Sequence, residues 1–207
     1  MKRLAILGAS GHGKVVADTA ESCGWSSISF FDDAWPDLKL NGVWSVVGNT
    51  QSLLDQLADF DGVVVAIGNN RIRYEKMLQL EAAGALLVPL IHPSAVVSKY
   101  ASIGKASVVF AGCVVNVGCR VGKGCILNTA CTVDHDAVLG DAVHISPGAH
   151  LAGGVTVGDR SWVGIGASVR QMIAIGSDVM IGAGAAVVAH VPDGETVVGV
   201  PARSFNL

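Results

Sequence analysis

The stretch VDHDAVLGDAVHISPGAHL (residues 133–151) has an aliphatic residue at every sixth position, and this spacing runs unbroken from residue 97 to residue 187. Neither the α-helix, with 3.6 residues per turn, nor the β-strand, with its alternation of two, produces a strict period of six. A parallel β-helix does, because each hexapeptide forms a short strand and a corner, with its aliphatic side chain in the core. The spacing therefore predicts a β-helix with these inward residues: Val97, Ile103, Val109, Val115, Val121, Leu127, Val133, Leu139, Ile145, Leu151, Val157, Val163, Val169, Ile175, Ile181 and Val187.

A second register supports this prediction. Four residues after the aliphatic residue stands a small or branched one, such as Ala101, Ser107 or Ala137. Three hexapeptides per triangular coil would place residues eighteen apart directly above one another. Glycines recur at or near the expected corners, where we expect positive φ to be used: Gly104, Gly122, Gly140, Gly158, Gly164, Gly176 and Gly182.

Four of the five cysteines follow the small-residue register at six-residue spacing: Cys113, Cys119, Cys125 and Cys131. Buried free cysteine behaves as a small hydrophobic side chain. We therefore interpret them as core residues rather than zinc ligands or disulfides, and we expect a reducing, cytoplasmic environment.

Composition narrows the function further. The 207 residues suffice for two small domains. The net charge of −3 and the lack of a basic cluster argue against nucleic-acid binding. Every window of eighteen residues has a polar interruption, so we expect no membrane span. The opening MKRLAILGAS passes straight into a glycine turn and is interpreted as a buried strand, not a signal peptide.

The residues before the hexapeptides alternate between strand and helix patterns. Strands are predicted at 3–7, 27–31, 62–67 and 86–90, and helices at 14–23, 51–58 and 71–83. This alternation is typical of a parallel sheet with helices on its faces, a small Rossmann-like domain. The boundary is placed near His92 and Pro93, which gives an α/β domain at 1–92 and a β-helix domain at 93–207.

A glycine-rich turn, Gly8-Ala9-Ser10-Gly11-His12-Gly13, follows the first predicted strand. Its glycines either serve close packing or form a phosphate cradle at a helix N-terminus. The spacing G-x-x-G-x-G differs from the dinucleotide fingerprint, which favours a nucleotide other than NAD. Asp32 and Asp33 end the second strand, where acidic residues meet a ribose or base; the alternative is a solvated strand end.

His135 is flanked by two carboxylates, in the run Asp134-His135-Asp136. A carboxylate that accepts a hydrogen bond from imidazole fixes its tautomer and raises its basicity, which suits a general base. The alternative is an exposed ion pair. No role is assigned to His150.

Several motifs occur in a fixed order along the chain: Gly8-Ala9-Ser10-Gly11-His12-Gly13, Phe31-Asp32-Asp33, Ala66-Ile67-Gly68-Asn69-Asn70, Ile91-His92-Pro93-Ser94-Ala95, Leu127-Asn128-Thr129, Asp134-His135-Asp136 and Gly199-Val200-Pro201-Ala202-Arg203. Together they resemble the sugar acyltransferases of the sialic-acid O-acetyltransferase and bacillosamine N-acetyltransferase type. The resemblance implies a left-handed β-helix, a homotrimer, and acetyl-CoA bound in the groove between neighbouring β-helices.

The resemblance also implies site residues. His135 would be the general base and Asp136, where some relatives carry Glu, would orient it. The acetyl-CoA contacts would be His144, Gly153, Ile165, Gly182, Ala183, Gly184 and, for the phosphates, Arg203. The backbone N–H of Gly153, one coil above His135, is expected to hold the oxyanion. The nucleotide-sugar contacts would be Ser10, Gly11, His12, Asp32, Asp33 and Gly68. No metal is needed.

The expected reaction is direct transfer, without an acyl-enzyme, from acetyl-CoA to the 4-amino group of a nucleotide-linked 4-amino-4,6-dideoxy sugar. The UDP-linked bacillosamine precursor is preferred, for the biosynthesis of a surface glycan or glycoprotein. Two alternatives within acyl transfer are O-acetylation of sialic acid or another sugar and N-acetylation of GDP-perosamine. A third is a non-catalytic β-helix that binds a nucleotide sugar as a scaffold.

Overall fold

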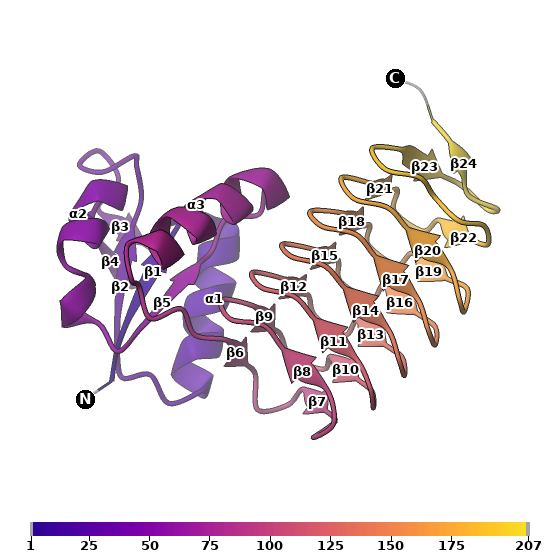
Figure 1. The fold of residues 1–207 in the computed structure, drawn as a ribbon. Coiled ribbons are helices and arrows are strands. Elements are labelled where there is room, and N and C mark those ends of the chain that lie inside the picture. The colour runs from indigo at the N-terminus through magenta and orange to yellow at the C-terminus, as the bar shows by residue number, and fades with distance from the viewer. Residues whose placement is uncertain (1, 206–207) are drawn as a thin grey trace. The chain divides into compact units, whose positions relative to one another are not determined.

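The computed structural model describes residues 2–205, and the chain divides into two compact units, Met1–Pro93 and Ser94–Leu207. The first unit is an α/β domain with a mostly parallel sheet in the strand order β3-β4-β2-β1-β5 (Figure 1). Its elements are β1 (Arg3–Leu7), α1 (Gly11–Ser22), β2 (Ser27–Phe31), β3 (Leu40–Asn41), β4 (Trp44–Gly48), α2 (Thr50–Asp55), η1 (Leu57–Asp59), β5 (Gly62–Val65), α3 (Asn70–Ala82) and β6 (Leu90–Ile91).

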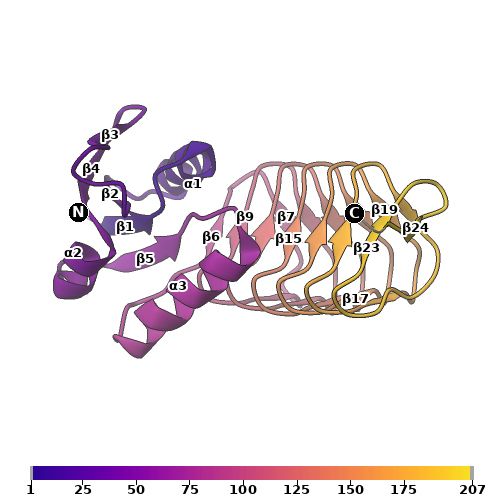
Figure 2. The ribbon, with the colours of Figure 1, turned by 90° about the horizontal axis from the view of Figure 1, so that it is seen from above.

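The core of this unit forms because β1 and β5 are apolar on both faces. Leu4, Ile6 and Val64 have no exposed surface. Helix α1 covers one side of the sheet, and α2 and α3 cover the other (Figure 2). This doubly covered parallel arrangement places the carboxyl ends of β1, β2 and β5, with the turns that follow them, at one edge of the sheet.

The sequence prediction for this unit needs three corrections. Helix α1 begins at Gly11, within the glycine-rich turn, rather than near Lys14. The antiparallel pair β3 and β4 was not predicted, because β3 is only two residues long. The strand predicted at 86–90 is reduced to a bridge between Leu87 and Val63, followed by β6.

The second unit is the predicted parallel β-helix, whose strands form three faces within residues 2–205. The first face holds β7 (Val96–Val97), β10 (Val114–Val115), β13 (Thr132–Val133), β16 (His150–Leu151), β19 (Ser168–Val169) and β22 (Ala186–Val187). The second holds β8 (Ser102–Ile103), β11 (Arg120–Val121), β14 (Val138–Leu139), β17 (Thr156–Val157) and β20 (Ala174–Ile175). The third holds β9 (Val108–Val109), β12 (Ile126–Leu127), β15 (His144–Ile145), β18 (Trp162–Val163), β21 (Met180–Ile181), β23 (Thr196–Val198) and β24 (Arg203–Ser204).

The eighteen-residue register is confirmed on every face. Val115 pairs with Val133, Leu139 with Val157 and Ile145 with Val163, in each case one coil apart. The cysteines of the small-residue register are buried, and the Sγ atoms of Cys113 and Cys131 stack 3.7 Å apart.

The reason for the corner glycines is different from the predicted one. Positive φ falls at other positions, again every six residues, where glycine alternates with residues such as Ala130, Asp136 and Met172. The seven glycines named from the sequence are not among the residues with positive φ. They are glycine because a Cβ would collide with the next coil; at Gly104, for example, it would meet the carbonyl oxygen of Gly122.

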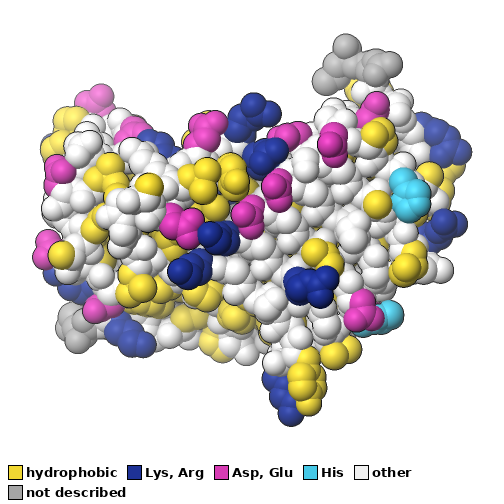
Figure 3. All heavy atoms as spheres, viewed as in Figure 1, with side chains coloured by type: hydrophobic (Ala, Val, Ile, Leu, Met, Phe, Trp, Pro, Cys, Tyr) yellow, Lys and Arg dark blue, Asp and Glu magenta, His cyan; other side chains and the backbone are white. Residues whose placement is uncertain are grey.

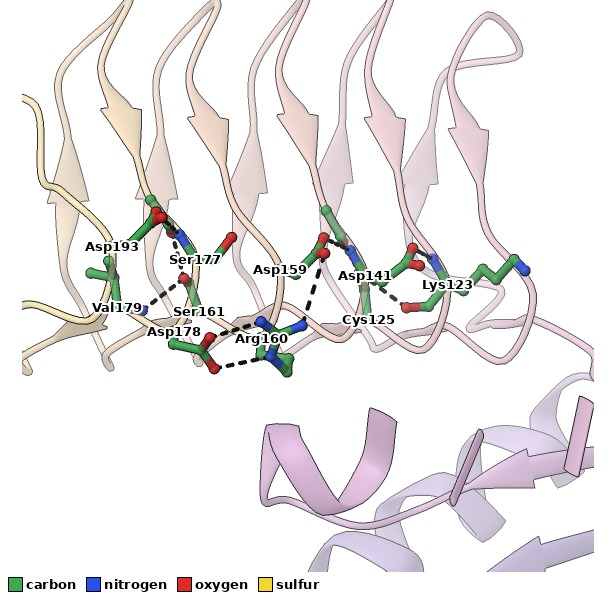
Figure 4. A network of polar contacts seen from close by, with 12 residues as sticks. Lys123, Cys125, Asp141, Asp159, Arg160, Ser161, Ser177, Asp178, Val179 and Asp193 are labelled. Carbon is green, nitrogen blue, oxygen red and sulfur yellow. Dashed lines mark hydrogen bonds and ion pairs between the residues drawn. The ribbon is translucent and has the colours of Figure 1, made fainter. Parts of the chain in front are cut away.

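A column of carboxylates joins the coils at the corner between the second and third faces (Figure 4). Asp141 accepts a hydrogen bond from the N–H of Lys123 at 2.8 Å, and Asp159 accepts one from the N–H of Asp141 at 2.8 Å. Higher up, Asp193 accepts from the N–H of Ser177 at 2.7 Å. These carboxylates satisfy backbone donors that the parallel strand ladder leaves over, so this corner serves the fold.

Candidate active site

His135 lies at the corner that follows the first face, between β13 and β14. Its Nδ1 is 2.9 Å from Oδ2 of Asp136, which has a positive φ of 62°. Because a carboxylate only accepts hydrogen bonds, Nδ1 is the donor of this pair, and in the neutral form of the ring Nε2 is the nitrogen with the free lone pair. The His135 side chain is 64% exposed, so substrate can reach it. This is the arrangement that a general base requires.

The coils above and below complete this corner. From the coil above, Gly154 donates its N–H to the carbonyl oxygen of His135 at 2.9 Å. Gly153 lies against the imidazole: a Cβ built on it would lie 2.5 Å from Nε2 of His135. Among the residues that the structure describes, none accepts a hydrogen bond from the backbone N–H of Gly153. A free backbone donor therefore lies beside the basic nitrogen.

The other flanking carboxylate has a structural partner. Asp134 accepts a hydrogen bond at 2.8 Å from Nδ2 of Asn116, one coil below. Of the two carboxylates beside His135, Asp136 is thus the one that bonds to the imidazole and Asp134 the one that joins coils.

A pocket of about 500 Å³ lies at a different corner, between the third and first faces. We call it the apolar pocket; its lining residues are Asn128, His144, Ser146, Pro147, Trp162, Gly164, Ile165, Met180, Ile181, Gly182 and Ala183. Four of the predicted acetyl-CoA contacts are among them: His144, Ile165, Gly182 and Ala183. Gly184 follows directly in the chain.

Two aromatic rings and an amide form one wall of the apolar pocket. His144 and Trp162 have ring centroids 4.3 Å apart, and Trp162 Nε1 donates to Ser146 Oγ at 2.7 Å. Asn128 Oδ1 accepts from the N–H of Thr129, so Asn128 Nδ2 faces His144 Nε2, at 3.2 Å. His144 consequently accepts this hydrogen bond through Nε2.

Two predicted acetyl-CoA contacts lie elsewhere. Gly153 is at the His135 corner rather than in the apolar pocket. Arg203 lies in β24 at the end of the β-helix, beside a smaller cavity of about 190 Å³, and its Nη1 donates to the carbonyl oxygen of Ala202. The structure therefore does not bring Arg203 into the apolar pocket.

The sequence did not single out Asn128 and Trp162 as lining residues. Asn128 belongs to the Leu127-Asn128-Thr129 motif, but the sequence assigns no role to its side chain. Trp162 is the outward residue of β18, a position for which the six-residue period predicts nothing. Its size among small neighbours was the available signal.

The turns that follow β1 and β5 contain glycines of two kinds: closed ones, where a Cβ would collide with other atoms, and open ones, where a Cβ would meet nothing. At Gly8 and Gly13 a Cβ would strike the carbonyl oxygens of Ala66 and Gly8, at 2.7 and 2.5 Å, so close packing requires them. At Gly11 and Gly68 a Cβ would meet nothing within 4 Å. The side chain of Ser10, the N-cap of α1, makes no capping hydrogen bond. The open glycines lie at the starts of α1 and α3, where backbone donors favour an anion.

Both acidic residues at the end of β2 organise these turns. Asp32 accepts hydrogen bonds from the N–H groups of Ala9 and Ala34, at 2.7 and 2.9 Å. Asp33 accepts from Lys76 Nζ at 2.7 Å and from the N–H of Thr50 at 2.9 Å. Although burial opposes its ionisation, the hydrogen bonds from Lys76 and Thr50 lower the pKa of Asp33 to about 2. Each carboxylate oxygen thus has at least one internal donor.

His12 occupies the start of α1. Burial, and then the positive charge of Arg73, lower its pKa to about 4. The imidazole is therefore neutral at physiological pH and offers a hydrogen bond rather than a charge.

The comparisons with known proteins match both units of the chain. The family described as "PglD N-terminal domain" matches residues 3–80. The acetyltransferase domain of PglB from Neisseria gonorrhoeae FA1090, solved with acetyl coenzyme A, is 46% identical with a TM-score of 0.94, and the match covers 99% of both chains. PerB from Caulobacter crescentus, solved with CoA and GDP-perosamine, is 38% identical with a TM-score of 0.93, covering 100% of this chain and 98% of PerB.

A curated relative gives a further match. The UDP-N-acetylbacillosamine N-acetyltransferase of Bacillus subtilis (strain 168) is 36% identical over 114 residues, which are 54% of this chain and 52% of the relative. The stacked parallel faces and the solved neighbours identify the second unit as a left-handed β-helix. Of the described residues, no helix is both long and apolar enough to cross a membrane.

Proposed function

Because this chain belongs to the hexapeptide-repeat sugar acyltransferases and is an acetyl-CoA-dependent sugar acetyltransferase, we propose that His135 is its general base. The observation that carries this proposal is the 2.9 Å hydrogen bond from Nδ1 of His135 to Asp136. It makes Nε2 the nitrogen that accepts a proton in the neutral ring, on an exposed side chain that lies against Gly153. Asp136 orients the imidazole and stabilises its protonated form.

The proposed reaction is direct transfer. The acceptor amine attacks the thioester carbonyl of acetyl-CoA, and Nε2 of His135 takes the proton that the nitrogen sheds. The N–H of Gly153 donates to the oxygen that becomes negative in the tetrahedral intermediate. Collapse of that intermediate breaks the carbon–sulfur bond, and the proton held by Nε2 of His135 passes to the departing CoA sulfur, which restores the base.

The apolar pocket suits the donor. A pantetheine arm is long and weakly polar, and the pocket combines apolar walls such as Ile165 and Ile181 with the polar groups of His144 and Asn128. We assign His144, Ile165, Gly182, Ala183 and the adjoining Gly184 to acetyl-CoA. Arg203 is kept as a contact for the CoA phosphates on the strength of its charge alone.

Cysteine is not the nucleophile in this proposal. Cys113, Cys119, Cys125 and Cys131 are at most 1% exposed. Burial raises the pKa of Cys119, which disfavours the thiolate that nucleophilic attack requires.

The acceptor that we propose is a UDP-linked 4-amino-4,6-dideoxy sugar, the precursor of N,N′-diacetylbacillosamine. The open glycines Gly11 and Gly68, with Ser10, His12, Asp32 and Asp33, would hold its nucleotide. The bacillosamine enzyme of Bacillus subtilis supports the UDP sugar, and PerB gives the GDP-perosamine alternative equal support. A cytoplasmic location and a role in glycan synthesis follow from these substrates.

The acceptor can be tested by thiol release from acetyl-CoA. We expect turnover of the UDP-linked 4-amino sugar with a kcat/KM at least about tenfold above that of GDP-perosamine, since one lost base contact costs about 1.4 kcal/mol. Free and CMP-linked sialic acid are included as acceptors to test for O-acetylation. Preference for the GDP sugar would select the perosamine alternative. Turnover of sialic acid alone would refute amine acetylation, and turnover of none of these sugars would show that the acceptor is a different sugar.

We further propose a homotrimer with active sites shared between chains. Within one coil, His135 lies at the corner that follows the first face, whereas the apolar pocket lies at the corner that precedes it. A thioester bound in the pocket of one chain would meet the His135 of a neighbouring copy.

Light scattering is expected to give a particle of about three times the 21.2 kDa chain mass. Mixing His135→Ala chains with Ile165→Arg chains, each inactive alone, should restore part of the activity, because some mixed sites combine two intact halves. A monomer in solution, or mixed samples without activity, would contradict the shared site.

A further inference from the structure

Two turns of the first unit lie side by side at the carboxyl edge of its sheet. A Cβ on Gly8 would meet the carbonyl oxygen of Ala66 at 2.7 Å and Cγ1 of Ile67 at 2.9 Å. The turn after β1 therefore touches the turn after β5. Each contributes one open glycine, Gly11 and Gly68. Any ligand on these glycines depends on the shape of both turns.

Arg73 of α3 holds the second of these turns from inside. Its side chain is among the largest that are fully buried, and the residue is 1% exposed. Nη1 donates to the carbonyl oxygens of Ile67 and Gly68, at 2.9 and 3.1 Å, and Nη2 donates to Oδ1 of Asn70 at 2.8 Å. One planar guanidinium thus fixes the backbone on both sides of the open Gly68.

Burying the charged side chain of Arg73 costs free energy. The guanidinium stays protonated in proteins, so its desolvation has to be offset by hydrogen bonds, and its field extends to its neighbours. At His12 the positive charge of Arg73 adds to the effect of burial, and both lower the pKa of the imidazole. His12 is the residue next to Gly11, so the charge of Arg73 acts on the other open turn as well.

We propose that Arg73 is a positioning residue for the nucleoside diphosphate of the acceptor. It shapes the Ile67–Asn70 turn through its hydrogen bonds to Ile67, Gly68 and Asn70, and its fixed positive charge favours a polyanion over the open glycines. Arg73 itself lies beneath the surface and does not touch the ligand. The inference rests on the proposed function, because it assumes that the first unit holds the acceptor's nucleotide.

Replacing Arg73 by lysine or by methionine separates the effect of its charge from the effect of its hydrogen-bond geometry. Arg73→Lys keeps the charge and loses the planar fork, whereas Arg73→Met loses both. We expect the acceptor KM, and the Kd for UDP or GDP from calorimetry, to rise about tenfold in Arg73→Lys and up to about 100-fold in Arg73→Met. The kcat at saturating acceptor and the KM for acetyl-CoA should stay within about twofold of wild type. Gln79→Met, which changes an exposed residue farther along the same helix, is the control and should change none of these values.

A purely structural role would lower the folded fraction, and with it the apparent kcat, instead of separating acceptor KM from kcat. If Arg73→Met does not fold by circular dichroism, Arg73→Lys and Asn70→Ala carry the test, since Asn70 anchors Nη2. An unchanged Kd in folded variants, with tight nucleotide binding by wild type, would overturn the role of Arg73 alone. If the wild-type protein binds neither UDP nor GDP, the inference falls together with the acceptor site of the proposed function.

Discussion

His135→Ala is expected to lower kcat by roughly 10²–10⁴-fold, the usual range for the loss of a general base. The imidazole is exposed at a corner, so its removal opens no core cavity and the β-helix should keep its unfolding temperature. The KM for acetyl-CoA should change little, because the apolar pocket lies at another corner of the coil. Steady-state kinetics with a saturating amino sugar measure the effect.

Two further variants test whether the decrease in kcat is due to the imidazole of His135 and its partner Asp136. Asp136→Asn keeps the shape of the side chain but removes the charge that stabilises the protonated imidazole, so an intermediate loss is expected. His150→Gln changes an exposed histidine of the first face that hydrogen-bonds to Thr132, and it should retain activity. Near-wild-type turnover by His135→Ala would exclude His135 as the base.

The β-helix could be predicted from the sequence because one physical constraint repeats at a fixed interval. Each coil must place an aliphatic side chain inward every six residues, and one slip would expose the whole set. The predicted inward residues Val133 and Leu151 are accordingly buried and paired one coil apart. The resemblance then supplied what periodicity does not contain, the left hand of the coil.

The parts that could not be predicted depend on contacts between distant residues. Whether Gly140 is glycine for its φ or for the approach of Asp159 is decided by the next coil, not by the local sequence. The burial of Arg73 depends on the turn that it holds. Trp162 occupies an outward strand position, where local pattern carries no information, and only the fold shows that it lines a pocket.

Gly153→Ala is expected to lower kcat by roughly 10²-fold without unfolding the coil. The new Cβ would lie 2.5 Å from Nε2 and 2.6 Å from Cε1 of His135, so the imidazole must move. A displacement of about 1 Å in a catalytic group typically costs about 10² in rate. Gly153 has no positive φ, so alanine adds no backbone strain there. Gly112→Ala is the control: its Cβ would be 3.7 Å or more from Ala130, an ordinary contact, and activity should persist despite the positive φ of that corner.

A double-mutant cycle decides how the added methyl group acts. If it acts by displacing His135, then Gly153→Ala should cost nothing further in a His135→Ala background, because the displaced group is already gone. If the two losses multiply, the methyl group acts independently of the imidazole. The loss would then lie in the second proposed role of this glycine, the N–H that holds the oxyanion. Position 153 requires glycine because the imidazole of His135 lies in the space that any side chain there would fill.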